Sequence, residues 1–255
     1  MANTVLKIIR RAIGVEKLII GEEKLKNRQE EIFGMEQEIL SALKFNNTVI
    51  ESQWLLHKSF SPGEAAISYA FLYTLYRVLS SVKPDKVLEF GLGQSSKMVH
   101  QYAHFFNKQA ITVEHDKDWV DFFMQSKEGE YPVNVKMLDL ETIEYKGERA
   151  LSYKNCKDTF QGEKFDLIIV DGPFGYLPEF NKYSRPQIID LVQGNISNDF
   201  IIIVDDYNRD GEKNTVNEVL DYFKKNNIDY VFREYKSNKN HMLITTPKLK
   251  FLTSL

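Results

Sequence analysis

Five short β-rich runs recur along the chain, each separated from the next by a segment long enough for a helix or a loop. They are KVLEF (86–90), AITVEH (110–115), VNVKML (133–138), FDLIIVD (165–171) and FIIIVDD (200–206). Parallel strands need crossover connections, so this alternation is typical of a parallel sheet with helices on both faces. The pattern therefore predicts an α/β fold.

Two further runs, IDYVFREY (228–235) and HMLITTP (241–247), are separated only by KSNKN. A connection this short suits a hairpin, so the last strand should be antiparallel. We expect a Rossmann-like, mostly parallel sheet of seven strands that ends in an antiparallel hairpin. The polar connection over 141–163 is longer than a minimal one and predicts a small insertion or a mobile lid.

The region before the first of these runs is helical in pattern. Over 4–43, apolar residues repeat every seven positions, at Leu18, Leu25, Ile32 and Ile39. Gly21 and Arg28 interrupt the complementary positions, which favours an arm packed on the main domain or on a partner over a long coiled coil. A second helix is expected to begin near Pro62 and to end at Pro84. These patterns predict a helical N-terminal arm over 1–60 and an α/β domain over 61–255.

Composition narrows the range of partners and compartments. The 255 residues carry 33 basic and 36 acidic side chains, a net charge of -3 that gives no bias toward nucleic acid. The single cysteine, Cys156, excludes an internal disulfide framework, and we expect a reducing, cytoplasmic setting. Basic and apolar residues mix in the first segment, which leaves peripheral membrane contact open. A homodimer is a further expected partner state.

Acidic residues follow the parallel runs almost without exception, at Glu89, Glu114, Asp139, Asp171, Asp205 and Asp206. The carboxyl ends of parallel strands meet at one edge of the sheet, where ligands of open α/β folds bind. A helix cap explains one acidic strand end, but it does not account for six that converge. The sequence therefore predicts a ligand site at this edge.

The first run leads into a glycine turn, EFGLG, whose dinucleotide-binding pattern is incomplete because Ser96 stands in place of the third glycine. A pyrophosphate is favoured at a helix N-terminus without nearby anions, whereas Glu89 brings negative charge there. A cation such as S-adenosylmethionine (SAM), which has a sulfonium, an ammonium and no phosphate, resolves this conflict. Its ribose hydroxyls can donate to a carboxylate such as Glu114.

The motifs LEFGLGQSS, ITVEHD, MLDL and DLIIVDGP, in that order, resemble a class I SAM-dependent methyltransferase over about 83–247. One departure is Ser95, where the family frequently has a third glycine. The resemblance implies a set of residues that bind SAM. They are Glu89, Gly91, Gly93, Gln94 and Ser95 at the glycine turn, Glu114 and His115 after the second strand, Asp139 and Leu140 after the third, and Asp171 after the fourth.

The later acids resemble those of metal-dependent O-methyltransferases such as catechol O-methyltransferase. This likeness implies a Mg²⁺ or similar divalent site at Asp171, Asp205 and Asp206, with Asp171 and Asp206 as the catalytic residues. Two alternatives stay open. Asp171 or Asp206 acts as a base without metal, or the three acids only begin a turn and cap a helix. Arg185 and Arg209 can pair with an anionic acceptor or a carboxylate, although a solvated surface position is the default expectation for both.

Short matches, EFGLGQSS, EHDKDW, VDGPFGY and DDYNR, are similar to methyltransferases of polysaccharide sugars, including the glucuronoxylan 4-O-methyltransferase group. This resemblance implies O-methylation of a small molecule or of a sugar in a surface-glycan precursor. Two competing hypotheses are a catalytically silent binding subunit with the same fold and an NAD-linked oxidoreductase. Trp119 is expected either to flank the adenine or simply to pack. Aromatic residues after the fourth strand, Phe174, Tyr176 and Tyr183, are expected to cover a ring or to cap the core.

Overall fold

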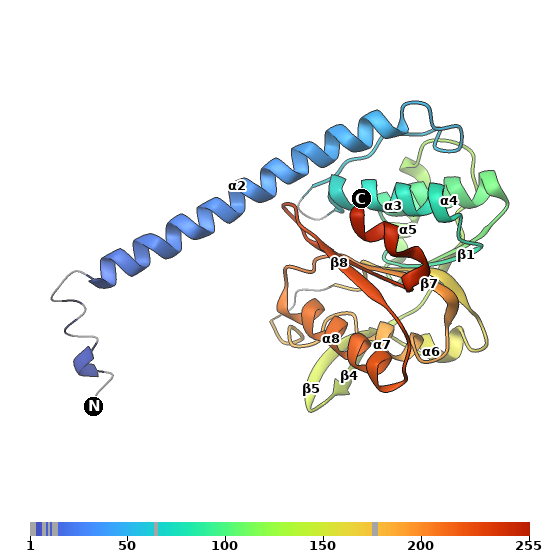
Figure 1. Ribbon diagram of the computed structural model, residues 1–255. Coiled ribbons are helices and arrows are strands. Elements are labelled where there is room, and N and C mark those ends of the chain that lie inside the picture. Colours follow the sequence, from blue (N-terminus) through green and yellow to red (C-terminus); the bar gives the residue numbers. More distant parts are fainter. Residues whose placement is uncertain (1–3, 7–8, 10, 12–14, 64–65, 175–177) are drawn as a thin grey trace.

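The computed structural model describes residues 4–6, 9, 11, 15–63, 66–174 and 178–255. A sheet lies at the centre of the main domain (Figure 1). It has seven strands in the order β3-β2-β1-β6-β7-β9-β8. The strands are β1 (Lys86–Phe90), β2 (Gln109–Glu114), β3 (Val135–Met137), β6 (Phe165–Val170), β7 (Ile196–Val204), β8 (Val231–Tyr235) and β9 (His241–Thr245). The first five in this order pair in parallel, and β9 is antiparallel to both neighbours. The predicted fold class is confirmed.

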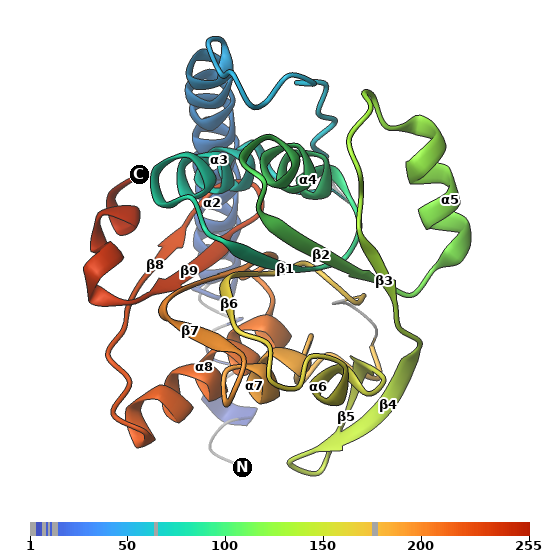
Figure 2. The same ribbon diagram turned by 90° about the vertical axis from the view of Figure 1, so that its right-hand side faces the viewer.

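Helices cover both faces of the sheet (Figure 2). On one side lie α3 (Tyr69–Val82) and α4 (Gln94–Phe106), and on the other α6 (Cys156–Thr159), α7 (Gln187–Leu191) and α8 (Asp210–Lys225). Successive strand residues point to opposite faces, so Val87 and Leu167 join one buried cluster while Leu88 and Ile168 join the other. The final 3₁₀ segment, η1 (Pro247–Ser254), packs against α3, β8 and β9, and its Leu252 joins the same buried cluster as Val87. The helix α5 (Lys117–Ser126) lies beside these layers.

The helix α3 begins later than the sequence pattern predicts. Its first residue is Tyr69, and the Ser68 hydroxyl accepts the Phe71 N–H at 3.1 Å as its N-cap. The expected start near Pro62 is wrong, because the Ser61 N–H donates to the Gln94 side chain at 3.1 Å and ties this stretch to α4. The end is as predicted, since the helix stops at Val82, just before Pro84.

Most of the described part of the N-terminal arm is one long helix, α2 (Val15–Val49), which projects well beyond the sheet (Figure 1). Its C-terminal part packs on the main domain through buried Phe45 and Val49, and Glu38 accepts the Tyr69 N–H at 2.6 Å. Packing of the arm on the main domain is therefore confirmed, while the domain boundary at residue 60 stays a prediction.

Much of the basic and apolar segment expected to touch membrane, residues 7–8, 10 and 12–14, lies outside the described residues. None of the described helices is long and apolar enough to cross a membrane.

The long connection after β3 forms a hairpin of its own. Strands β4 (Leu140–Tyr145) and β5 (Glu148–Tyr153) pair antiparallel as a second, two-stranded sheet. The predicted insertion is thus present as ordered β structure. Its last residue, Tyr153, is buried and stacks on Phe90 of β1, with ring centroids 5.6 Å apart. The hairpin therefore supplies a side chain to the carboxyl edge of the main sheet.

Candidate active site

A cavity of about 590 Å³ opens at the carboxyl edge of β1, β2, β6 and β7. This is the edge to which the sequence assigned the ligand site. Predicted site residues on its wall are Gly91, Gly93, Gln94, Glu114, His115, Asp171 and Asp206. Other wall residues were not among the predicted cofactor or catalytic residues, including Trp119, Tyr153, Phe174, Arg185, Arg209 and Lys239. The structure thus brings most of the predicted residues together around one space.

The glycine turn packs directly on the end of β6. Gly91 has φ +93°, and a Cβ added there would lie 2.9 Å from the Asp171 carbonyl oxygen. Its N–H donates to the Val113 carbonyl at 3.0 Å. A side chain at position 91 would therefore be strained both by its backbone and by contact. Gly93, in contrast, begins α4 and has no atom within 4 Å of such a Cβ, so its backbone is open to a ligand.

Glu114 fixes the glycine turn to the end of β2. Its Oε2 accepts the Leu92 N–H at 3.0 Å, and its Oε1 accepts the N–H groups of His115 and Asp116 at 2.6 and 3.0 Å. The carboxylate is nearly buried but lies on the cavity wall. These contacts orient the carboxylate, whose remaining lone pairs can accept ligand hydroxyls. Its predicted role toward a ribose stays a prediction.

Trp119 extends the wall beside the glycine turn. Its Nε1–H donates to the Leu92 carbonyl at 2.6 Å, and the side chain is 41% exposed. Trp119 belongs to α5, and the Asp116 carboxylate caps this helix by accepting the Trp119 N–H at 3.0 Å. Nearby, the His115 and Phe174 rings lie edge-on with centroids 5.4 Å apart. Aromatic surface therefore lines this end of the cavity, as a planar ligand requires.

Glu89 lies behind the glycine turn and not on the cavity wall. It is fully buried, and its Oε2 accepts the Thr112 hydroxyl at 2.7 Å, which also lies 2.9 Å from His100 Nε2. In the described part of the chain, its Oε1 is a buried oxygen without a hydrogen-bond partner. Burial raises the pKa of Glu89, an effect that the Ser95 and Thr112 hydroxyls partly offset.

Three other predicted cofactor residues are off the cavity wall. Ser95 is buried in α4, while Asp139 and Leu140 lie where β3 leads into the β4–β5 hairpin. Asp139 is exposed, and its carbonyl accepts the Lys154 N–H at 2.8 Å. Their predicted contacts with SAM stay predictions that the cavity wall does not support directly.

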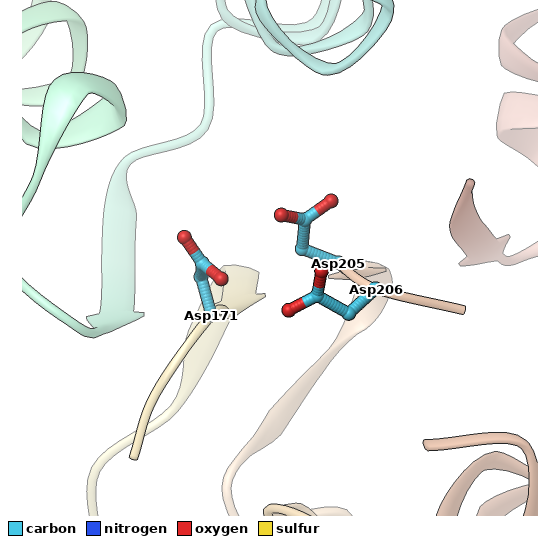
Figure 3. Close-up of side chains that lie close together, drawn as sticks. All are labelled: Asp171, Asp205 and Asp206. Carbon is cyan, nitrogen blue, oxygen red and sulfur yellow. The ribbon is translucent and has the colours of Figure 1, made fainter. Parts of the chain in front are cut away.

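The three aspartates predicted to hold metal do converge (Figure 3). Carboxylate oxygens of Asp171, Asp205 and Asp206 lie within 4.8 Å of one another. Sequence neighbours Asp205 and Asp206 follow β7, and Asp171 follows β6, which pairs with it in parallel. The parallel register therefore places the three carboxylates side by side, as the strand-end argument predicted.

Three cations share this cluster. Arg185 Nη2 lies 3.2 Å from Asp171 and 2.8 Å from Asp206, and its side chain is only 4% exposed. Lys239 Nζ lies 3.2 Å from Asp205 and 3.1 Å from Asp206. Arg209 Nη1 is 2.8 Å from Asp206 as well. The default expectation of a surface position for Arg185 is wrong, and the alternative, a pair with a carboxylate, is confirmed.

This arrangement does not fit a divalent ion. An oxygen-bound metal needs carboxylate oxygens free to approach to about 2.0–2.6 Å. Both oxygens of Asp206 face cationic nitrogens at 2.8–3.1 Å, and Lys239 approaches Asp205. A divalent cation placed among the three aspartates would be repelled by the positive charges of Arg185 and Lys239. The arrangement therefore gives the predicted metal site no support.

The surroundings shift the pKa values of the three aspartates in different directions. Burial and the neighbouring Asp205 raise the pKa of Asp171 well above its usual range, although Arg185 acts in the opposite direction. Burial also raises the pKa of Asp205. For Asp206, burial is outweighed by Arg185, Lys239 and Arg209, which together lower its pKa. Asp171, 22% exposed on the cavity wall, is thus the better proton acceptor of the two predicted catalytic residues.

Sequence reasoning gave Arg185 no buried role and did not single out Lys239. Arg185 lies late in the connection from β6 to α7, and Lys239 lies in the turn between β8 and β9, so neither stands directly at the end of a parallel strand. The Lys239 ammonium is held by the Ala66 carbonyl at 3.0 Å, a contact spanning 173 positions. Local pattern carries no signal for contacts of this range.

Comparisons with known proteins agree with the methyltransferase resemblance. No protein-family model matches the chain. Over 138 residues, 52% of the chain, it is 27% identical to "Putative methyltransferase MJ0046" of Methanocaldococcus jannaschii, and it spans about half (49%) of that protein. The predicted resemblance to a methyltransferase is confirmed by this similarity.

Solved structures that are similar include two methyltransferases with bound SAH. The plantazolicin methyltransferase BpumL matches with 12% identity, 83% of this chain, 96% of that chain and a TM-score of 0.43. PaMTH1 of Podospora anserina matches with 16% identity, 78% of this chain, 94% of that chain and a TM-score of 0.42.

Proposed function

We propose that the chain is a SAM-dependent methyltransferase. The observation that carries the proposal is the cavity at the glycine turn, where Gly91 packs on β6, Gly93 leaves its backbone open and Glu114 and Trp119 form the adjoining wall. Its volume of about 590 Å³ lies within the 300–1,000 Å³ typical of small-ligand sites. The sequence similarity to a methyltransferase supports the same reading.

The charges at this end of the cavity suit a cationic cofactor. Glu114 and Asp116 are both on the wall, and buried Glu89 keeps an acceptor oxygen without a partner in the described chain. SAM carries a sulfonium and an ammonium, so a wall of carboxylates favours it, whereas the pyrophosphate of NAD would be repelled. This arrangement disfavours the alternative of an NAD-linked oxidoreductase.

For the transfer step we propose Asp171 as the general base. It faces the cavity, its pKa is raised, and Arg185 holds one of its oxygens. Methyl transfer from a sulfonium needs an aligned acceptor and a group that takes the acceptor's proton. Asp206, whose pKa is lowered by its three cations, acts by orienting Arg185. In this mechanism a hydroxyl oxygen attacks the methyl carbon, its proton passes to Asp171, and S-adenosylhomocysteine leaves.

The proposed acceptor is a hydroxyl of a small molecule or of a sugar in a surface-glycan precursor. Support comes from the sugar-methyltransferase likeness of the motifs and from Arg209, whose side chain is on the cavity wall and 31% exposed. All three cations contact buried carboxylates, but Arg209 is the most exposed of them, at 31% against 4% for Arg185 and 12% for Lys239, so it is the cation best placed to meet an acidic group on the acceptor. We expect Arg209→Met to raise KM for an acidic sugar more than for a neutral one.

Calorimetric titration of SAM, followed by methyl transfer to a panel of sugars and phenols with and without EDTA, tests this proposal. We expect SAM binding and EDTA-insensitive turnover. Asp171→Asn should lower kcat by roughly 10²–10⁴-fold with SAM affinity retained, whereas Asp210→Asn, at a side chain 93% exposed, should not. Absence of SAM binding refutes the proposal. Binding without transfer to any acceptor favours the alternative of a silent binding subunit, and turnover lost in EDTA restores the metal hypothesis.

A further inference from the structure

Two segments of the main domain that α2 contacts also contribute to the cavity wall. One is the turn between β8 and β9, which contains Lys239, and the other is the stretch leading into α3, which contains Ala66 and Ile67. The helix meets the turn at Gly34 and the start of α3 at Glu38, about one helical turn further along. One face of α2 therefore supports two parts of the same wall that are far apart in the sequence.

Gly34 lets α2 approach the β8–β9 turn closely. A Cβ added at this position would lie 3.0 Å from the Ser237 carbonyl oxygen and 3.4 Å from the Asn238 Cα. Glycine is unfavourable inside a helix, and the close approach gives a physical reason for it here. Gly21, in the same helix, has no atom of the described chain within 4 Å of an added Cβ. The backbone of the turn thus rests directly on α2 at position 34.

Glu38 holds the start of α3. Its Oε1 accepts the Tyr69 N–H at 2.6 Å, while the Ser68 hydroxyl accepts the Phe71 N–H at 3.1 Å. The first N–H groups of a helix lack partners within the helix, and the helix dipole favours a carboxylate beside them. Glu38 therefore fixes the point at which the chain leaves the cavity wall at Ile67 and becomes helical.

The Lys239 ammonium joins the two supported segments to the buried aspartates. It donates to the Ala66 carbonyl at 3.0 Å and lies 3.2 Å from Asp205 and 3.1 Å from Asp206. An ammonium has three N–H donors, so these three contacts can use all of them. The Lys239 backbone belongs to one segment that α2 supports, and its carbonyl acceptor belongs to the other. A shift of α2 would therefore disturb both ends of this contact.

The β8–β9 turn can pass a displacement at Ser237 on to Lys239 because it is bonded internally. The Ser237 hydroxyl donates to the Lys239 carbonyl at 2.7 Å, and the Ser237 N–H donates to the Asn240 side chain at 3.3 Å. On the other side, the Asn240 carbonyl accepts the Tyr207 N–H at 2.8 Å, directly after Asp206. The turn thus connects α2 with the end of β7.

We propose that the docking of α2 on the main domain positions Lys239 and so completes the acceptor end of the cavity, with Gly34 and Glu38 as positioning residues. Neither of these two residues is on the cavity wall, and each acts through a segment that is. The assignment of this end of the cavity to the acceptor rests on the proposed function, whereas the effect of α2 on Lys239 does not.

Nuclear magnetic resonance of the full chain labelled with ¹⁵N-lysine gives a test that needs neither cofactor nor acceptor. The Lys239 ammonium is 12% exposed and ion-paired, so its protons should exchange slowly enough to give a signal, which Lys239→Arg removes and thereby identifies. We expect Gly34→Gln and Glu38→Ala to shift this signal or to broaden it beyond detection. Gly21→Gln and Glu36→Ala, in the same helix, should leave it unchanged.

Conservative variants keep this test decisive. Thermal unfolding shows which variants fold, and Gly34→Ala, which requires a shift of only a few tenths of an ångström, replaces Gly34→Gln if that variant does not. Glu38→Gln retains an oxygen for the Tyr69 N–H and should keep the wild-type Lys239 signal. An unchanged signal in folded variants of Gly34 and Glu38 overturns the proposal, and so does an equal shift in the two control variants.

Kinetics with SAM and a panel of sugars and phenols measures the consequence for the reaction. Glu38→Ala should raise KM for an acceptor by about fivefold or more, with SAM affinity within about twofold of wild type. Lys239→Met should have a similar effect, and the double variant should be no worse than Lys239→Met alone, because both changes act on one ammonium. Effects that multiply in the double variant overturn the positioning role. Absence of SAM binding by the wild type refutes the proposed function instead, and the Lys239 signal still decides this inference.

Discussion

Arg185 and Asp206 form a buried ion pair 2.8 Å long at the carboxyl edge of the sheet, with both side chains 4% exposed. Arg185 also donates to the carbonyls of Val170 and Asp205 at 3.3 and 3.1 Å. One guanidinium therefore joins the ends of β6 and β7 and fixes the carboxylates that follow them. Arginine suits this position because its planar fork can serve several acceptors at once.

Removal of this guanidinium should destabilise the protein strongly. Arg185→Met leaves Asp206 and Glu212 buried with less compensating charge, so the free energy of unfolding should fall by about 3–5 kcal/mol. Urea denaturation at neutral pH measures the loss. Arg149→Met is the matched control, because Arg149 is 62% exposed and 3.6 Å from Glu179, and it should change stability by less than about 0.5 kcal/mol. Equal losses in both variants would show that the buried pair has no special role.

The two glycines of the turn should respond differently to the same substitution. Gly91→Ala meets both a φ of +93° and the Asp171 carbonyl at 2.9 Å, so it should cost about 2–4 kcal/mol of folding stability. Gly93→Ala meets nothing within 4 Å and should leave stability unchanged within about 1 kcal/mol. Thermal unfolding compares them. A loss of SAM affinity in folded Gly93→Ala would show that the ligand needs that open backbone, and equal destabilisation would contradict the packing argument.

The sheet and the edge of the site could be predicted from local pattern alone. Short β-rich runs at regular spacing specify parallel strands, and the parallel arrangement then brings Glu114, Asp171 and Asp206 to one edge. The start of α3 could not be predicted from local pattern. Ser61, the expected cap, is held by Gln94, which is 33 positions away in the sequence, and the observed cap is Ser68. A local capping signal competes with tertiary contacts of this kind, and helix propensity does not account for tertiary contacts.

The chemistry of the acidic cluster could not be predicted in the same way. Three aspartates that follow strands can bind a metal ion, act as a general base or cap a helix. Which of these roles they have depends on Arg185, from the connection before α7, and on Lys239, from the turn between β8 and β9. The position of Glu89 behind the cavity wall could not be predicted from the sequence either. In a central strand covered on both faces, alternation does not tell which side chain faces the ligand and which lies behind it.

Trp119 should report on cofactor binding. Its indole donates to the Leu92 carbonyl in the glycine turn and is 41% exposed, whereas the other tryptophan, Trp54, is 6% exposed in the core. SAM binding should therefore change the fluorescence of Trp119, and Trp119→Phe should abolish the change and weaken binding by about tenfold through loss of one hydrogen bond and ring area. Trp54→Phe should keep the signal. Persistence of the signal in Trp119→Phe would place the ligand elsewhere.

Glu89 should make stability depend on pH in a defined direction. Its pKa is raised in the folded state by burial, so the unfolded chain releases this proton at lower pH than the folded one. The wild type then loses stability as pH rises from the unfolded pKa, near 4.5, toward the folded value. Glu89→Gln lacks this ionisation and can still accept the Thr112 hydroxyl.

The gain in unfolding free energy from Glu89→Gln should therefore increase between pH 4 and pH 8. Urea denaturation at several pH values measures it, with Glu148→Gln, at an exposed position, as a control whose difference should stay flat. Titration of SAM into the same variants separates folding from binding, because Glu89→Gln should lower affinity for a cation only above the folded-state pKa of Glu89, where the wild-type carboxyl is ionised. A gain that shrinks with rising pH would instead mean that Glu89 is ionised and stabilised in the folded protein.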